Sequence, residues 1–268
     1  MTTQEKIKEL LSKEAYRFDD LVSVVEILRS DIGCPWDREQ THKSIRKDLI
    51  EETYEVIEAI DTEDPKLMRE ELGDVLLQVV FHARIEQEEG RCSMDDVAND
   101  ICVKLIHRHP HVFGDVVAET SEKVLSNWEK IKSEEKERVT VTDKLKAIPP
   151  MLPALMRAEK VGKKASCFDF PTTADVIQKV YEELGEVKEA IDEGNVQHVE
   201  EEIGDLLLTV TSLCRKIGVE PEVALGKATN KFIDRFETLE TAVLERGGDI
   251  KSMSMTELDT IWDEIKHK

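Results

Sequence analysis

The sequence has few of the residues that interrupt helices and few of those that favour strands. Its 268 residues include 12 glycines and 8 prolines, and only 5% are aromatic. No segment alternates apolar and polar residues between turn signals in the manner of a β-strand. The five cysteines are an odd number, scattered without a Cys-x-x-Cys pair, which argues against a disulfide scaffold or a zinc ribbon. This balance favours an all-α protein.

Basic residues and long apolar runs are also scarce. Lysine and arginine number 37 against 58 acids, a net charge of -21. That balance argues against a nucleic-acid partner, and a polyphosphate ligand would need metal ions or a local basic patch. The N-terminus is polar and amphipathic, and no run approaches the length of a bilayer span. We therefore expect a cytoplasmic protein with no membrane partner.

Apolar residues recur at the helical period along almost the whole chain. A segment containing three prolines, residues 139–153, predicts a linker without regular helix. It separates an N-terminal domain (1–138) from a C-terminal one (154–268). Short connections make consecutive helices antiparallel neighbours, so each domain is expected to resemble a four-helix bundle. The predicted helices span residues 4–29, 42–60, 66–89, 94–108, 121–138, 154–164, 174–193, 196–217, 221–245 and 256–267.

One pattern of acids occurs twice. Glu-Glu-x-x-Glu followed by Glu-x-x-Asp begins at Glu51 and again at Glu182, and all five acids recur at a constant offset of 131 positions. A long internal repeat indicates two copies of one structural unit. The repeated acids are Glu51, Glu52, Glu55, Glu71 and Asp74 in the first copy, and Glu182, Glu183, Glu186, Glu202 and Asp205 in the second.

Helical spacing of three and four residues places the acids of each helix on one face. If the two helices form a hairpin, the acidic faces meet, and the carboxylates repel one another unless a cation lies among them. Oxygen ligands of this kind select hard ions such as Mg²⁺ or Mn²⁺. The alternative is that these are ordinary solvated acids, as is usual in so charged a chain.

The second helix of each pair argues for a metal site. Residues 72–81 are apolar nearly all round, and Glu71, Asp74, Gln78 and His82 form one narrow polar strip. The repeat places Glu202, Asp205, Thr209 and Ser212 in the same way. A helix buried on most sides carries charge only where the charge is needed or paired.

Several flanking runs carry a family resemblance. With the doubled acid motif, the chain resembles the MazG family of nucleoside triphosphate pyrophosphohydrolases, in the all-α NTP pyrophosphatase superfamily, nearly from end to end. The more specific runs are Gly33-Cys34-Pro35-Trp36-Asp37, Glu70-Glu71-Leu72-Gly73-Asp74, Gln78-Val79-Val80-Phe81-His82 and the run from Arg108 to Gly114.

The resemblance implies hydrolysis of nucleoside triphosphates to the monophosphate and pyrophosphate, with water attacking the α-phosphorus. It implies that Mg²⁺, with Mn²⁺ as an alternative, is held by Glu183, Glu186, Glu202 and Asp205. It also implies that Glu182 and Glu183 are catalytic, with Glu182 assisting either the water or the second shell of the metal. The first copy offers Glu52, Glu55, Glu71 and Asp74 as a second set of ligands. A bound divalent cation neutralises polyphosphate charge and lowers the pKa of bound water.

Basic residues at helical spacing supply the other half of a nucleotide site. Lys231 and Arg235 lie one turn apart, as do Trp262 and Lys266, and the family resemblance assigns them to nucleotide contact. Arg suits phosphate as a planar donor and Lys as a point charge. The alternative for the lysines and the arginine is ordinary surface charge, and the alternative for Trp262 is packing in a core or a dimer interface. By similarity, Lys179 and Tyr181 line the pocket, although Tyr181 is equally plausible as core.

The first copy has Lys104, Arg108, Trp128 and Lys132 in the same arrangement, but Asp100 and Val103 replace Lys227 and Asn230. We therefore expect the second copy to be the main nucleotide site and the first to have weaker nucleotide contacts or to serve dimerisation. A homodimer is expected. The competing hypothesis is a helical interaction module with structural metal sites. His107, His109 and His111 suggest zinc or nickel as one alternative and a turn around Pro110 as the other.

Overall fold

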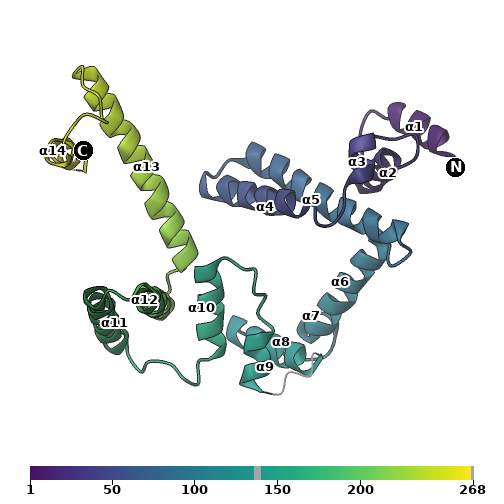
Figure 1. The fold of residues 1–268 in the computed structure, drawn as a ribbon. Coiled ribbons are helices and arrows are strands. Elements are labelled where there is room, and N and C mark those ends of the chain that lie inside the picture. Colours follow the sequence, from purple (N-terminus) through teal and green to yellow (C-terminus); the bar gives the residue numbers. More distant parts are fainter. Residues whose placement is uncertain (136–139, 267–268) are drawn as a thin grey trace. The chain divides into compact units, whose positions relative to one another are not determined.

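The computed structural model describes residues 1–135 and 140–266, and within them every regular element is a helix. The chain divides into two units, residues 1–132 and 133–268. No helix among the described residues has both the length and the apolar character needed to span a bilayer. The prediction of an all-α chain is confirmed (Figure 1).

The first unit is organised around α5, its longest helix. α5 packs against α4 as a helix hairpin, and it also contacts α2 and α6. A core of Val25, Ile45, Val80, Phe81 and Ile85 joins α2, α5 and the segment before α4. The helices are α1 (Thr3–Leu11), α2 (Phe18–Leu28), α3 (Pro35–Glu39), α4 (Arg46–Asp61), α5 (Pro65–Glu88), α6 (Met94–Arg108), α7 (Pro110–Phe113) and α8 (Ser121–Glu135), which runs just past the unit boundary.

The second unit contains the equivalent hairpin, formed by α11 and α12. α10 packs against α12 and against α13, and α14 folds back on α13 over a core of Leu239, Val243 and Ile261. Asp169, before α11, pairs with Arg215 of α12 at 2.6 Å and ties the preceding loop to the hairpin. The helices are α9 (Val141–Lys146), α10 (Ala154–Lys164), α11 (Thr173–Glu193), α12 (Val196–Lys216), α13 (Pro221–Glu245) and α14 (Met255–Lys266).

The two hairpins repeat each other down to their turns. Asp64 caps α5 by accepting from the backbone N–H groups of Lys66 and Leu67, and Asn195, 131 positions later, caps α12 in the same way. Side-chain oxygens at this position satisfy N–H groups that lack a helical partner. The preceding residue has a positive φ in both turns, 53° at Glu63 and 71° at Gly194. The repeat is therefore one of backbone geometry as well as sequence.

Three short helices and one break differ from the sequence prediction. The single helix predicted over 4–29 is wrong: the side chain of Asp20 accepts from Arg17 N and Lys13 Nζ, which fixes a turn between α1 and α2. α3 and α7 each begin with a proline, whose fixed φ suits the first helical position. α9 lies inside the linker predicted to lack regular helix, and a Thr140–Asp143 capping box starts it. Residues 136–138 and 267, predicted as helical, lie outside the described residues.

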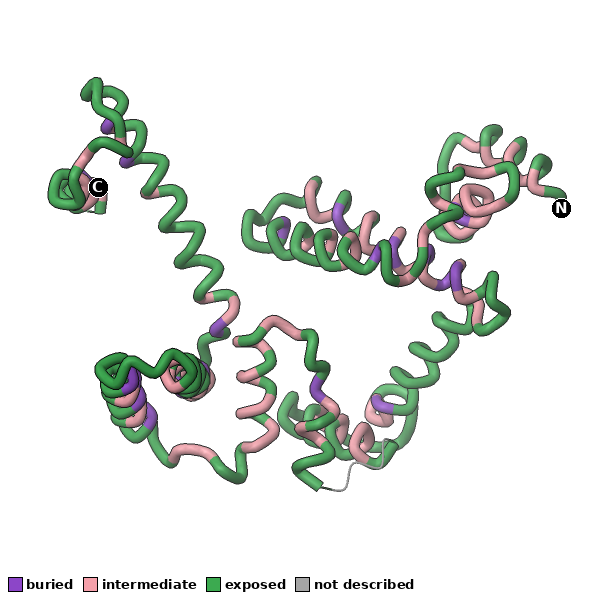
Figure 2. The backbone as a smooth tube through the Cα atoms, in the orientation of Figure 1, coloured by how far each residue is buried: buried purple, intermediate pink, exposed green. Residues whose placement is uncertain are grey.

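Buried residues lie mainly on the facing sides of paired helices, and much of the remaining chain is exposed (Figure 2). On α12, Ile203 and Leu207 are 42% and 50% exposed, and on α11 Leu184 is 52% exposed. Large apolar side chains exposed on both helices of one hairpin are typical of a face that contacts another molecule.

Candidate functional site

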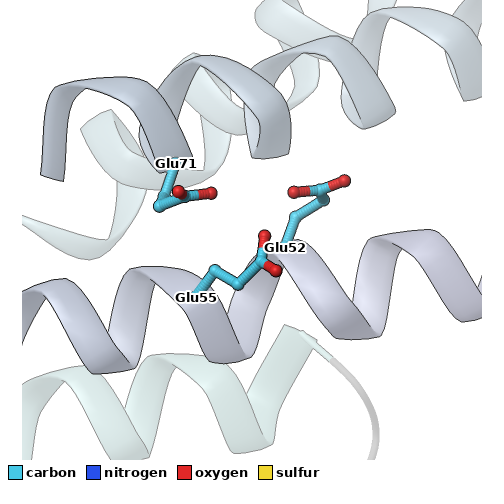
Figure 3. Close-up of side chains that lie close together, drawn as sticks. All are labelled: Glu52, Glu55 and Glu71. Atoms are coloured by element: carbon cyan, nitrogen blue, oxygen red, sulfur yellow. The ribbon is translucent and has the colours of Figure 1, made fainter. Parts of the chain in front are cut away.

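The acids of the first unit converge between the two helices of its hairpin. Glu52 and Glu55 extend from α4 and Glu71 from α5, and their carboxylates face one another across the gap (Figure 3). One oxygen from each lies within 4.8 Å of the other two. We call these three residues the N-terminal acid cluster. The expected meeting of two acidic helix faces thus occurs here.

Proximity and burial change the protonation of the N-terminal acid cluster. Burial, followed by a hydrogen bond with Glu55 and the charge of Asp74, raises the pKa of Glu52 to about 7. Burial and the charge of Glu55 also raise the pKa of Glu71. Desolvation and like charges both disfavour ionised carboxylates. A cation among these oxygens would remove that penalty.

The second unit repeats this arrangement with Glu183 and Glu186 on α11 and Glu202 on α12. One oxygen of each again lies within 4.8 Å of the others. We call this set the C-terminal acid cluster. The Glu183 side chain is 7% exposed, while Glu182, its neighbour in sequence, is 54% exposed. Glu183 therefore points into the hairpin and Glu182 lies at its edge.

Two basic side chains contact the C-terminal acid cluster. Lys179 Nζ lies 2.5 Å from Glu182 Oε1 and 2.9 Å from Glu183 Oε1, and its distance to Glu186 Oε2 is 3.8 Å. His198 Nε2 lies 3.1 Å from Glu202 Oε1. Hydrogen bonds to Glu182 and Glu183 raise the pKa of Lys179, and a hydrogen bond to Glu193 raises that of His198. Burial raises the pKa of Glu186, although the charge of Lys179 opposes it.

Asp74 and Asp205, the fourth predicted ligands, fall outside the two groups of converging oxygens. Each lies three residues after a cluster member on the same helix, Glu71 or Glu202, and so on nearly the same face. The charge of Asp74 raises the pKa of both Glu52 and Glu71, which locates it near the N-terminal cluster. Asp205 is exposed at the equivalent position.

The donor set fits a hard divalent cation. Both clusters offer only carboxylate oxygens, the ligands that Mg²⁺ and Mn²⁺ prefer. The raised pKa values of Glu52 and Glu71 agree with this, because burial and the neighbouring acids both disfavour the ionised carboxylates and a bound cation would relieve both effects. Among the described residues, no group containing His107, His109 or His111 meets the same distance criterion.

The predicted phosphate-binding residues lie together on α13. Lys227, Asn230 and Lys231 are exposed and Arg235 is half-buried. Within the described part of the chain, neither Lys231 nor Arg235 forms an ion pair or hydrogen bond with the C-terminal acid cluster. The structure thus brings Lys179 to the acids and leaves the α13 residues on a separate helix.

The predicted base-stacking residue, Trp262, packs inside the second unit. Its ring lies 5.4 Å from that of Phe232 and it borders the α13–α14 core. Lys266 lies on the same helix, 3.4 Å from Asp263. Tyr181 is 65% exposed, so its alternative role as a core residue is wrong. In the first unit the equivalent Trp128 is flanked by two cations, Arg108 at 5.3 Å and Lys132 at 4.3 Å from the ring centroid.

Two polar contacts were missed at the sequence level. His198 lies four residues before Glu202 on α12, and that spacing was the available signal. His42 contacts His82 (Nδ1 to Nδ1, 2.7 Å) and Glu86 (2.6 Å), with the two rings stacked. His82 belongs to the predicted polar strip of α5, but nothing in the sequence indicated that a residue 40 positions away completes it.

Comparison with known proteins agrees with the doubled hairpin. The model of the MazG nucleotide pyrophosphohydrolase domain matches residues 40–113 and 172–239. A Thermotoga maritima protein named nucleoside triphosphate pyrophosphohydrolase/pyrophosphatase MazG is 45% identical over 93% of this chain and 95% of its own length. The nucleoside triphosphate pyrophosphohydrolase of Escherichia coli K12 is 43% identical over 94% and 98%. The chain belongs to the MazG nucleotide pyrophosphohydrolase family.

Proposed function

We propose that the protein hydrolyses nucleoside triphosphates, or their deoxy forms, to the monophosphate and pyrophosphate. The observation that carries the proposal is the C-terminal acid cluster, in which three carboxylates converge from the two helices of one hairpin. The names of the Thermotoga maritima and Escherichia coli relatives support the same reaction. Such an enzyme would act on the nucleotide pool of the cytoplasm.

In this proposal Glu183, Glu186, Glu202 and Asp205 hold Mg²⁺ or Mn²⁺. When bound, the ion supplies charge neutralisation of the triphosphate and a lowered pKa for the attacking water. Glu182 lies at the edge of the cluster and is accessible to solvent. It would accept the proton of the water attacking the α-phosphorus, while the buried Glu183 fixes the site on α11.

The triphosphate itself would be bound by basic side chains from three helices. Lys179 already lies among the acids, and Lys227, Asn230, Lys231 and Arg235 on α13 would contact the phosphates. Trp262 and Lys266 on α14, with Tyr181 on α11, would contact the base and sugar. These assignments rest on helix spacing and on the family resemblance, and they require α13 to approach the acids of its own or of a second copy.

The apolar surface of the hairpins supports a homodimer. Ile203, Leu207 and Val210 form an exposed row on α12, and Ile177, Leu184 and Ile191 form another on α11. A second copy of the chain would bury both rows.

The experiment that tests the function is incubation of the full chain with nucleoside triphosphates and Mg²⁺, followed by product analysis. Monophosphate plus pyrophosphate is the expected outcome, and EDTA should abolish it. Diphosphate plus phosphate would overturn the proposed bond cleavage. No turnover on a panel of canonical, deoxy and damaged nucleotides would favour a non-catalytic interaction module.

The same assay shows which of the two units carries the catalytic activity. Glu202→Ala with Asp205→Ala should lower kcat/KM by at least ~1,000-fold, because metal ligation is lost. Glu71→Ala with Asp74→Ala is the matched control in the first unit and should retain most of the activity. If only the control pair loses activity, the N-terminal cluster is the catalytic one.

A further inference from the structure

The two acid clusters differ in one respect. The C-terminal acid cluster contains the cationic side chain of Lys179, and the N-terminal acid cluster contains no such cation among the described residues. In the C-terminal cluster, Lys179 Nζ lies 2.9 Å from Glu183 and 3.8 Å from Glu186, between two of the three converging carboxylates. His198 contacts the third, Glu202, at 3.1 Å. All three acids of this cluster thus have a basic neighbour.

The N-terminal cluster lacks both basic residues. The positions equivalent to Lys179 and His198 are Asp48 and Leu67. Among the described residues, Glu52, Glu55 and Glu71 form no ion pair. Lys47, five residues before Glu52, contacts Glu51 at 2.6 Å, with both side chains more than half exposed. Glu51 is not a member of the N-terminal acid cluster, so Lys47 does not offset the negative charge of that cluster.

An ammonium group among the carboxylates opposes a metal ion at the same oxygens. Two cations at contact distance repel, so a metal bound by Glu183 and Glu186 requires Lys179 to swing away. The side chain can do so because its charge sits on a flexible four-carbon stem. A polyphosphate arriving with the metal gives the displaced ammonium a new anionic partner, which couples the binding of the two ligands.

We propose that Lys179 is a built-in counter-cation that competes with divalent metal, so that the C-terminal cluster takes up metal together with an anionic substrate, whereas the N-terminal cluster binds metal alone. This inference rests on the metal sites of the proposed function. In this inference, Lys179 leaves Glu183 when the site is loaded and then contacts the polyphosphate.

The test is Mn²⁺ binding to the full chain without nucleotide, followed by electron paramagnetic resonance of free Mn²⁺. Two classes of site are expected, and Glu71→Gln should remove the tighter one and so assign it to the N-terminal cluster. Lys179→Met should tighten the weaker class by about threefold to tenfold, the effect of removing one partly exposed competing charge. Lys179→Arg retains the charge and should leave the weak class weak.

The internal repeat supplies a mirror experiment and a matched control. Asp48→Lys places an ammonium at the equivalent point of the first unit and should weaken the tight class. Lys47→Met removes a neighbouring lysine that contacts only Glu51, and should change neither class.

The outcomes separate this inference from the metal assignment. If Mn²⁺ binds but Lys179→Met leaves the weak class unchanged or weakens it, competition by Lys179 is refuted while the metal sites stand. If Lys179→Arg tightens the site as much as Lys179→Met, charge is not the cause and the inference also fails. If neither cluster binds Mn²⁺ in any variant, the metal assignment fails and this inference with it.

Discussion

His82 illustrates how a single side chain can link stability to pH. It is half-buried on α5 and its ring stacks on that of His42 at 5.0 Å. Burial, and then the charge of His42, lower the pKa of His82. The other charged groups at this contact are Glu86, which bonds His42, and Arg91, which bonds Glu86. Hydrogen bonds from Arg91 and His42 hold the pKa of Glu86 at about 2, so it stays ionised throughout the range in which histidine titrates.

The sign of the effect follows from proton binding. The folded state holds its proton on His82 less tightly than the unfolded chain, whose histidines titrate near pH ~6.5. The contribution of neutral His82 to the stability of the folded state is therefore fully present above pH ~6.5 and is lost as the pH falls below that value. We predict that lowering the pH from about 7.5 to 5.5 reduces the melting temperature less in His82→Gln than in the unmodified chain. His111→Gln, which removes a histidine elsewhere in the first unit, should retain the full dependence. If the melting temperatures of all three proteins fall by the same amount over this pH range, the role of His82 is disproved.

At the scale of elements, the hairpin turns offer a direct comparison of two residue types in one backbone geometry. Gly194 has a φ of 71° at the end of α11, and Glu63 has 53° at the matching turn. A side chain at positive φ costs about 1–2 kcal/mol, whereas glycine adopts this region freely. An added Cβ at Gly194 would meet no atom within 4 Å, so backbone strain alone determines the effect of substitution.

We predict that Gly194→Ala lowers the free energy of unfolding of the second unit by about 1 kcal/mol. Glu63→Gly should raise that of the first unit by a smaller amount, because glycine also increases the entropy of the unfolded chain. Urea denaturation followed by circular dichroism measures both. Gly226→Ala, in the interior of α13 with open space around it, is the control and should stabilise. A neutral or stabilising Gly194→Ala would contradict the argument.

The hairpins were predictable from the sequence because their signals are local and doubled. Acid spacing, the apolar character of residues 72–81 and the breaks at Asp64-Pro65 and Gly194 all act within a few residues. The break between α1 and α2 was not predictable, because it depends on Lys13 and Arg17 meeting Asp20. The His42–His82 contact was not predictable either, because it depends on tertiary packing between residues 40 positions apart. Lys179, in contrast, lies three and four residues before Glu182 and Glu183, so helix spacing already brings it to the acids.

At the scale of the whole molecule, the exposed apolar rows of α11 and α12 bear on assembly. Leu207 is 50% exposed at the centre of the α12 row, flanked one turn away by Ile203. We predict a homodimer, with a mass twice the 30.6 kDa of the chain, in light scattering coupled to size-exclusion chromatography. Leu207→Glu should shift the equilibrium toward monomer by placing a charge in the apolar contact.

The control for assembly is Gln197→Glu, which adds the same charge at an exposed polar position of α12 outside the apolar row. It should leave the mass unchanged. A chain that is monomeric at every concentration would refute the dimer, and the nucleotide site would then have to form within one copy.

The positions of the tryptophans have an optical consequence. Trp36 is 62% exposed and Trp128 has two cations over its ring, both in the first unit, whereas Trp262 packs on Phe232 in the second. The three indoles therefore sit in different dielectric surroundings and should emit at different wavelengths. Replacing Trp36 and Trp128 with phenylalanine would leave Trp262 as the only tryptophan. Its fluorescence would then report on the α13–α14 region alone as ligands are added.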